Sequence, residues 1–340
     1  MQEKPVAVVT GGAGFIGSHM TDRLLQEGYR VRVVDNLTGG RVSNLAHHAH
    51  NPDLVLEECD IRTLPTDSPI FEDVRHVFHF AGIGDIVPSI EQPIEYMATN
   101  VQGTVRTLEA ARHGGRLSLR RFVYAASSSC YGLAKTPTGE EYPIQPQYPY
   151  ALSKYQGEQT VLHWSQVYDL PVNSMRIFNA YGPRVRTTGA YGAVFGVFFR
   201  QKLAGKPFTV VGDGTQTRDF IYVTDVVDAF FRAAICLQVG EIYNVGADNP
   251  QSILRLVALL GGQVDNKDVV FIPKRPGEPD CTWANSHKIT HQLGWKPQVD
   301  FATGVGIMLK DIEKWRDAPL WDADSIAAAT ATWFKHMDKK

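Results

Sequence analysis

A tyrosine and a lysine four residues apart are the residues in this sequence best suited to chemistry. Tyr150 and Lys154 lie in the segment YPYALSK, and on a helix this spacing puts both side chains on one face. A free phenol has a pKa of about 10 and is a poor base at neutral pH, so it needs a positive neighbour that stabilises its phenolate. The Lys154 ammonium would supply that charge. The pair therefore predicts a base that removes a proton from a hydroxyl group of a substrate.

A run of hydroxyl side chains precedes this pair. Ser127, Ser128 and Ser129 follow a β-branched segment in VYAASSSCYG, where a strand is expected to end. A hydroxyl at that end can bridge a substrate oxygen and Tyr150. We therefore expect the serines and the tyrosine to share one site.

Three glycines at the start of the chain indicate a second site. Gly11, Gly14 and Gly17 come directly after the strand-like run VAVVT and open a helical pattern. The first glycine permits a tight turn, the second lets the backbone approach a pyrophosphate, and the third lets the helix pack closely on the strand. The expected contacts are these glycines together with Phe15 and Ile16, at a helix N-terminus that favours phosphate.

An acid at the end of the second predicted strand completes this pattern. Asp35 lies 24 residues beyond Gly11 and is followed by Asn36. A carboxylate at this point accepts hydrogen bonds from a ribose 2′-hydroxyl and repels a 2′-phosphate. The sequence therefore predicts NAD, rather than NADP, as the cofactor, with Asp35 and Asn36 at the adenosine ribose.

Two further strand ends are expected near the cofactor. The CDI segment is expected to end the third strand, where Asp60 could contact the adenine amino group and Ile61 could pack on the ring. Alternatively, Asp60 is an acid at the end of a strand with no role in cofactor binding. The HFAG segment is expected to end the fourth strand, where small residues such as Ala81 let the backbone approach the cofactor.

The elements that must position these residues alternate between strands and helices. Such alternation predicts an α/β fold with a doubly wound parallel (Rossmann) sheet, in which ligands bind at the carboxyl ends of the strands. We expect an NAD-binding domain over 1–180 and a smaller α/β substrate-binding region over 181–340, with a strand at 242–245 that could return to the main sheet and a helical extension over about 318–340. The expected strands are Val6–Val9, Val31–Val34, Leu54–Leu56, His76–Phe80, Phe122–Ala125 and Val172–Arg176. The expected helices are Phe15–Glu27, Pro93–Ala111, Pro149–Val167 and Asp322–Lys340, the last capped by Asp322 or Asp324.

Composition excludes a disordered, collagen-like or coiled-coil chain. The 340 residues are 44% hydrophobic and 21% charged, which is ordinary for a globular protein, and the net charge is −2. That balance gives no reason to expect a nucleic-acid or membrane partner. The four cysteines show no metal-binding spacing, so no metal site is expected, and a cytoplasmic enzyme fits best. They are Cys59, Cys130, Cys236 and Cys281.

Seven segments together resemble a known family. TGGAGFIGSH, HFAG, SSSCYG, YPYALSK, RIFNAYGPR, TRDFIYVTDV and RPGEPDCTWA follow the order and spacing of the extended short-chain dehydrogenases/reductases. The sequence looks most like their nucleotide-sugar 4-epimerases, which act on UDP-hexoses or UDP-N-acetylhexosamines, and the resemblance runs from about Val6 to Trp315. It implies epimerisation at C4 through a transient 4-keto sugar, with bound NAD, a place in polysaccharide biosynthesis, and a homodimer formed through the helices at Pro93–Ala111 and Pro149–Val167.

The resemblance also assigns roles to individual residues. Tyr150 would be the base at the sugar 4-hydroxyl, Lys154 would hold the nicotinamide ribose, and Ser127 would be the catalytic hydroxyl. Asn100 matches an asparagine on the cofactor side. The remaining matched residues would bind the nucleotide sugar: Asn179, Arg218 and Arg275 at the diphosphate and Glu278 at the uridine ribose.

Two positions bear on the reaction and the sugar. Dehydratases and decarboxylases of the family carry acids where Ser128 and Ser129 stand, and neutral hydroxyls cannot replace that protonation chemistry. A dehydratase or decarboxylase remains the alternative, with Cys130 as an unusual acid or base. In hexose-restricted relatives a tyrosine occupies the position of Thr282. The smaller side chain favours a UDP-N-acetylhexosamine or its uronic acid.

Overall fold

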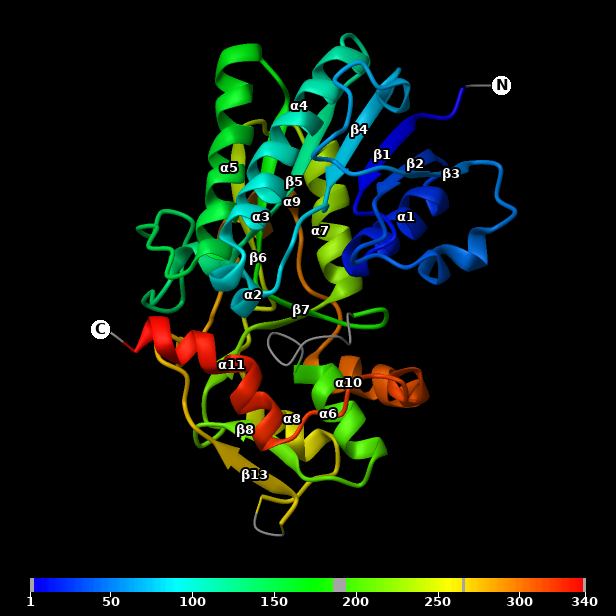
Figure 1. The fold of residues 1–340 in the computed structure, drawn as a ribbon. Coiled ribbons are helices and arrows are strands. Elements are labelled where there is room, and N and C mark those ends of the chain that lie inside the picture. The colour runs from blue at the N-terminus through cyan, green and yellow to red at the C-terminus, as the bar shows by residue number, and fades with distance from the viewer. Residues whose placement is uncertain (1–2, 186–193, 265–266, 339–340) are drawn as a thin grey trace.

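A seven-stranded parallel sheet forms the centre of the molecule (Figure 1). The computed structural model describes residues 3–185, 194–264 and 267–338. The strand order is β11-β6-β5-β4-β1-β2-β3, and every neighbouring pair runs parallel. The strands are β1 (Val6–Thr10), β2 (Arg30–Asp35), β3 (Leu54–Glu58), β4 (Val74–His79), β5 (Arg121–Ser127), β6 (Val172–Ile177) and β11 (Glu241–Val245). The doubly wound fold is therefore confirmed, and the strand predicted at 242–245 does join the main sheet.

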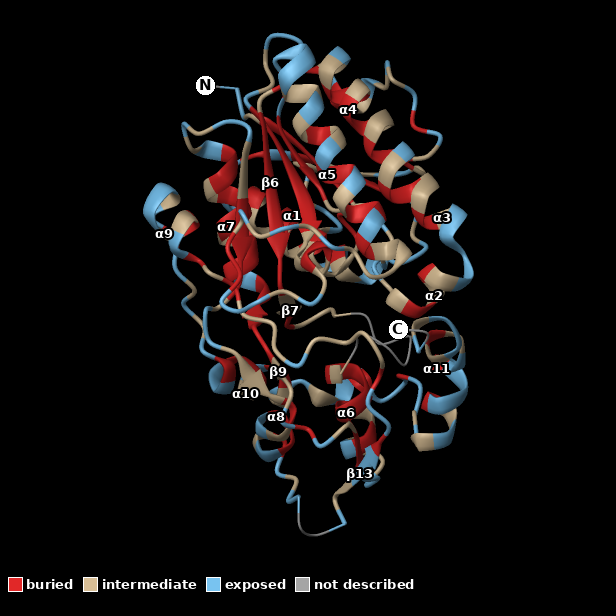
Figure 2. Cartoon of the chain, turned by 90° about the vertical axis from the view of Figure 1, so that its left-hand side faces the viewer, coloured by how far each residue is buried: buried red, intermediate tan, exposed pale blue. Residues whose placement is uncertain are grey.

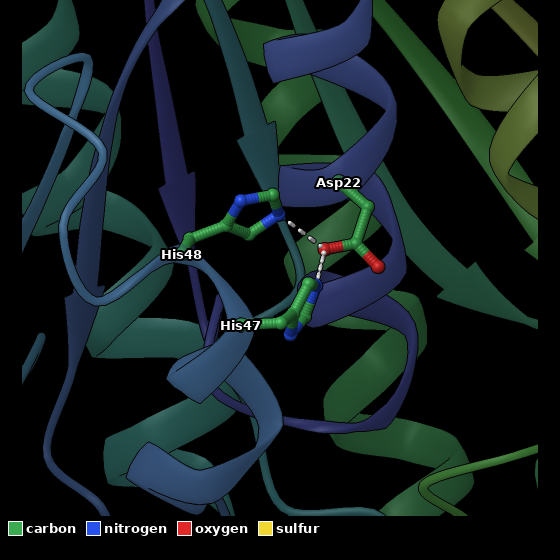
Figure 3. Close-up of side chains that lie close together, drawn as sticks. All are labelled: Asp22, His47 and His48. Carbon is green, nitrogen blue, oxygen red and sulfur yellow. Dashed lines mark hydrogen bonds and ion pairs between the residues drawn. The ribbon is translucent and has the colours of Figure 1, made fainter.

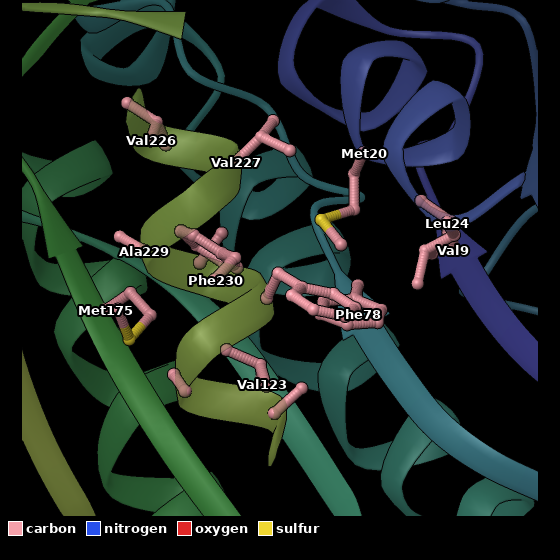
Figure 4. Close-up of a cluster of buried hydrophobic side chains, with 14 of the residues drawn as sticks. Val9, Met20, Leu24, Phe78, Val123, Met175, Val226, Val227, Ala229 and Phe230 are labelled. Carbon is pink, nitrogen blue, oxygen red and sulfur yellow. The ribbon is translucent and has the colours of Figure 1, made fainter. Parts of the chain in front are cut away.

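Helices cover both faces of this sheet, so the side chains of its central strands are buried on both sides. One face packs on α1 (Phe15–Gln26), α7 (Val223–Ile235) and α9 (His287–Leu293). Figure 4 shows Met20 of α1, Phe230 of α7 and Phe78 of β4 meeting in this core. The other face packs on α4 (Gly103–Gly114) and α5 (Pro149–Tyr168). Figure 2 shows the strands and α7 buried, while α4 and α5 keep exposed outer faces.

The helix predicted over Pro93–Ala111 is confirmed, and it contains a π-helical segment that the sequence did not predict. The chain forms α2 (Ile86–Glu91), α3 (Pro93–Met97), a π-helical turn (Ala98–Gln102) and then α4. The turn carries Asn100, whose side chain binds both backbone groups of Ile83. A tertiary contact thus selects a wider turn, which helical periodicity alone does not reveal.

A smaller lobe lies below the carboxyl ends of the strands (Figure 1). Its core is aromatic, with Tyr181, Phe195, Phe220 and Phe301 in mutual ring contact. Its elements are β7 (Asn179–Tyr181), α6 (Val194–Leu203), β8 (Phe208–Val211), β9 (Thr217–Arg218), β10 (Phe220–Tyr222), β12 (Gln251–Ser252), α8 (Ile253–Leu259), β13 (Val269–Ile272), α10 (Phe301–Lys310) and α11 (Ala323–Met337). Across both lobes, the described residues also form 3-10 helices at Val42–His48, Pro69–Phe71, Ser128–Tyr131 and Ile312–Trp315.

The C-terminal helix begins where the sequence predicted. Asp322 caps α11, accepting a hydrogen bond from the Ser325 backbone at 2.8 Å. In the described residues, no helix is long and apolar enough to cross a bilayer.

Candidate active site

The glycine-rich loop is shaped for a dinucleotide. Gly11 has a φ of +68°, and a Cβ built on it would stand 2.7 Å from the backbone nitrogen of Ala81. A Cβ on Gly17 would stand 2.1 Å from the carbonyl oxygen of Gly11. Gly14 is the N-cap of α1, and no described side chain caps this end. The amide donors of Phe15 and Ile16 therefore stay available for phosphate, which is the arrangement that NAD requires.

Asp35 ends β2 as predicted and is tied to this loop. Its carboxylate accepts hydrogen bonds from the backbone nitrogens of Ala13 at 2.9 Å and Leu37 at 2.8 Å. Burial raises the pKa of Asp35, and these backbone donors oppose the rise. Each carboxylate oxygen can accept a further hydrogen bond, so the group can still receive a ribose hydroxyl.

The CDI segment follows β3 rather than ending it, because the strand stops at Glu58. Hydrogen bonds from Arg62 lower the pKa of Asp60 to about 2, so this acid is ionised and held in an ion pair. Asn36 also donates to Asp60, at 3.0 Å. The Ile61 side chain is buried against Gly103, where a Cβ would stand 2.6 Å from its Cδ1. Adenine contacts from Asp60 and Ile61 stay predictions.

The serine run and the tyrosine meet where β5 and α5 converge. Ser127 ends β5, and its hydroxyl lies 2.8 Å from Ser129 Oγ and near the phenol of Tyr150. Burial raises the pKa of Tyr150, whereas the Ser127 hydroxyl lowers it. Ser128 is partly exposed at the start of the next turn. The structure therefore brings Ser127, Ser129 and Tyr150 together.

Lys154 lies one turn further along α5, on the cofactor side. Its Nζ sits 4.7 Å from the ring centre of Tyr124 and 3.8 Å from where a Cβ on Gly82 would stand. Burial lowers the pKa of Lys154 to about 8. Asn100 fixes the adjoining loop, since its Oδ1 accepts a hydrogen bond from the Ile83 backbone at 2.8 Å. The expected stabilisation of the Tyr150 phenolate by Lys154 stays a prediction.

A buried ion pair behind Lys154 was not predicted. Glu158 follows Lys154 by four residues and raises its pKa. The guanidinium of Arg176 on β6 contacts Glu158 at 2.6 Å, and the two side chains are 3% and 1% exposed. The helical spacing of Tyr150, Lys154 and Glu158 was a usable signal for the acid. No sequence pattern pointed to its partner.

Three charged residues of the smaller lobe, to which the resemblance assigns the nucleotide, lie close together. Arg218 donates to Glu278 Oε1 at 2.6 Å, and Arg275 Nη1 lies 3.8 Å from Oε2. Two buried guanidinium groups on one carboxylate leave a net positive charge, which suits a diphosphate. Glu278 Oε2 is buried without a hydrogen-bond partner in the described part of the chain. It fits a ribose hydroxyl, and the adjoining cavity of about 400 Å³ is lined by both Arg218 and Glu278.

Asn179 and Thr282 also meet. The Thr282 hydroxyl donates to Asn179 Oδ1 at 2.8 Å and accepts from the Asp219 backbone at 3.1 Å. The buried Asp219 carboxylate accepts hydrogen bonds from the backbone nitrogens of Ala247 and Ala284, each at 2.8 Å. Burial raises the pKa of Asp219 to about 6. Asp219 thus organises three loops around the predicted substrate contacts, although it was not selected from the sequence.

Cys130 is the only thiol in the serine run. It is 2% exposed in a cluster with Tyr131, Phe178 and Ala284. Burial raises the pKa of Cys130 to about 12, so the thiol stays protonated at neutral pH. This environment is that of an inert buried cysteine.

Tyr148 connects the catalytic residues with the charged group. Its ring stacks on Tyr150 at 6.4 Å between ring centres. The Glu278 carboxylate and the Arg218 guanidinium both influence the pKa of Tyr148, in opposite directions, on top of the rise caused by burial. The predicted base and the predicted diphosphate site are therefore within electrostatic reach of one side chain.

One group of potential metal ligands lies on the outer side of α1 (Figure 3). The Nε2 atoms of His47 and His48 lie 2.8 and 2.9 Å from Asp22 Oδ1. Arg184 lies 2.9 Å from the other carboxylate oxygen, so that carboxylate is already neutralised. The cluster links α1, the 3-10 helix Val42–His48 and Arg184. Arg186 and the segment TTGAYG fall outside the described residues.

Comparisons with known proteins bear on the family of this chain. The model of the NAD dependent epimerase/dehydratase family matches residues 7–246. The chain is 37% identical over 315 residues to a UDP-glucose 4-epimerase of Mycolicibacterium smegmatis, covering 91% of this chain and 98% of that protein. It is 33% identical to UDP-glucuronic acid decarboxylase 2 of Arabidopsis thaliana, covering 95% and 72%. The crystal structure of a UDP-glucuronic acid 4-epimerase from Bacillus cereus, in complex with UDP-glucuronic acid and NAD, is 30% identical with a TM-score of 0.82 and covers 91% of this chain and 99% of that one.

Proposed function

We propose that this chain, which belongs to the NAD dependent epimerase/dehydratase family, inverts the configuration at C4 of a UDP-sugar through a transient 4-keto sugar. The observation that carries the proposal is that Ser127 and Tyr150 lie next to each other at the same edge of the sheet as the glycine loop and Lys154. NAD, when bound, supplies the acceptor and later the donor of the C4 hydride. The relatives at 30–37% identity include epimerases that act on UDP-sugars, which supports this class of substrate.

The chain's own residues would accept the proton of the sugar 4-hydroxyl and hold the nucleotide in place. Tyr150 takes the proton of the 4-hydroxyl, and the adjacent Ser127 hydroxyl holds both oxygens in line. Lys154 holds the nicotinamide ribose. Arg218, Arg275 and Glu278 keep the nucleotide in place while the keto sugar turns.

We propose a UDP-N-acetylhexosamine or its uronic acid as the sugar. The support is the small side chain of Thr282, whose hydroxyl is engaged by Asn179. The similar Bacillus cereus enzyme acts on UDP-glucuronic acid, which supports a uronic acid. A homodimer formed through α4 and α5 stays a prediction.

The alternative is a dehydratase or decarboxylase, and the similarity to the Arabidopsis decarboxylase supports this alternative. The protonated, buried Cys130 and the neutral Ser128 and Ser129 weigh against it, since none supplies a carboxylic acid.

Incubation of the purified protein with a panel of UDP-sugars, with C4 stereoisomers resolved by NMR, tests the proposal. We expect interconversion of one C4 pair without loss of carbon dioxide or water. Tyr150→Phe should retain bound NAD and lose at least about 100-fold in turnover. Carbon dioxide release or an accumulating keto sugar would instead establish the alternative, and unchanged turnover of the Tyr150→Phe variant would remove the tyrosine from the mechanism.

A further inference from the structure

The C-terminal helix α11 joins the two lobes beside the candidate active site. Figure 1 shows it lying below α2 and above β8. Its fifteen residues span about 22 Å. The segment before it is fixed to the smaller lobe, because Arg200 and Gln201 of α6 donate to the carbonyls of Ala318 at 3.1 Å and Trp321 at 2.8 Å.

The far end of α11 packs on the elements that flank Tyr150. Trp333 is fully buried in a cluster with Val87 of α2, and Ile86, Ile90, Tyr148 and Met337 pack around it. Its ring centre lies 5.5 Å from that of Tyr148, which in turn stacks on Tyr150. One indole therefore supports the residue that lies two positions before the predicted base.

The same indole holds the segment that carries the predicted diphosphate ligands. Trp333 Nε1 donates to the carbonyl oxygen of Pro276 at 2.8 Å. Pro276 lies between Arg275 and Gly277, and a Cβ on Gly277 would stand 3.0 Å from Met337 Cε. The closing residue of this short turn is Glu278, whose backbone nitrogen donates to the Arg275 carbonyl at 3.3 Å. A shift of the Pro276 carbonyl would therefore move both charged side chains.

We propose that α11 is a clamp and that Trp333 is a positioning residue for the nucleotide sugar, an inference that rests on the proposed function. Its indole N–H sets the position of Arg275 and Glu278, while its ring keeps Tyr148 against Tyr150. Simple packing of a terminal helix would need neither a directed hydrogen bond to Pro276 nor contact with both lobes.

Two substitutions separate the two contacts. Trp333→Phe keeps an aromatic ring against Tyr148 and removes the N–H, so we expect the Kd for UDP and the KM to rise about fivefold, with kcat within twofold of wild type. Fivefold corresponds to about 1 kcal/mol, the ordinary worth of one hydrogen bond. Trp333→Ala removes both contacts, so kcat should also fall, by about tenfold or more.

The measurements use the full-length, NAD-loaded protein: UDP titration by calorimetry, steady-state kinetics, NAD content and melting temperature. Lys335→Ala changes an exposed residue of α11 and should match wild type. Ile326→Ala removes a buried contact two turns earlier and controls for loss of helix packing, so it should lower the melting temperature without changing UDP affinity.

Unchanged UDP affinity in both Trp333 variants would overturn the inference, as would an Ile326→Ala variant with the same kinetic changes as Trp333→Phe. A wild-type protein that neither binds UDP nor converts a UDP-sugar would overturn the proposed function itself. The two failures are therefore distinguishable.

Discussion

Replacing Lys154 by methionine should stabilise the fold at pH 7 while it abolishes turnover. Burial lowers the pKa of Lys154 from its ordinary value of 10.5 to about 8. A difference of about 2.5 in pKa, at about 1.4 kcal/mol for each unit, means that the buried ammonium costs about 3.5 kcal/mol of folding free energy. Methionine fills a similar volume without charge but loses the contact with the Tyr124 ring, worth about 1 kcal/mol. The expected net gain is about 2.5 kcal/mol.

The lowered pKa of Lys154 also determines how the difference in stability changes with pH. Below pH 8 the lysine is protonated in both the folded and the unfolded chain, so the whole cost is present. Between about pH 8 and 10.5 the unfolded chain keeps a proton that the folded chain has released, so wild-type stability rises with pH. The advantage of methionine should therefore shrink and disappear as the pH approaches 10.5.

Urea unfolding of the NAD-free proteins at pH 7 and pH 10, followed by circular dichroism, measures this difference. Lys206→Met, at an exposed position, serves as the matched control and should change the free energy of unfolding by less than about 0.5 kcal/mol at either pH. A Lys154→Met protein that is less stable than wild type at pH 7, or whose advantage is the same at pH 10, would refute the argument. The NAD-loaded variant should lose at least about 100-fold in kcat.

Two further substitutions test the cofactor loop and the buried thiol. Gly17→Ala would place a Cβ 2.1 Å from the Gly11 carbonyl oxygen, so the purified protein should lose its NAD, measured by absorbance after denaturation, whereas Gly39→Ala, with open space around its Cβ position, should keep it. Cys130→Ala should keep kcat within about threefold, since burial raises the pKa of the thiol to about 12; a loss beyond 100-fold would restore Cys130 as an acid or base.

The sequence was most informative where a short local pattern determines the structure. The strands that end at Asp35 and near Ser127 are apolar because both faces of the sheet are covered, so their runs stand out. The smaller lobe was predicted only in outline, because pairs such as β9 with β12 contain two residues each and have no measurable periodicity. Their pairing is set by tertiary packing rather than by local preference.

The same distinction holds for the site. Tyr150 and Lys154 could be paired from their spacing, because a helix brings residues four apart together. Asp219 could not be found, because it contacts Ala284 across 65 residues of sequence. The three residues Arg218, Arg275 and Glu278 were reached through resemblance alone, and the structure shows them in contact.

The pair Glu158–Arg176 explains why the acid one turn from Lys154 does not offset the burial of its ammonium. Without a partner, the Glu158 carboxylate, one helical turn from Lys154, could bind the ammonium and cancel its charge. Arg176 instead takes both carboxylate oxygens, with contacts of 2.6 to 3.2 Å. Glu158 then still raises the pKa of Lys154 but does not offset the burial that lowers it to about 8. With a pKa of about 8, Lys154 stays protonated at neutral pH, which is the charge state that the predicted stabilisation of the Tyr150 phenolate requires, and the buried ion pair beside it is weak evidence for stability of the fold.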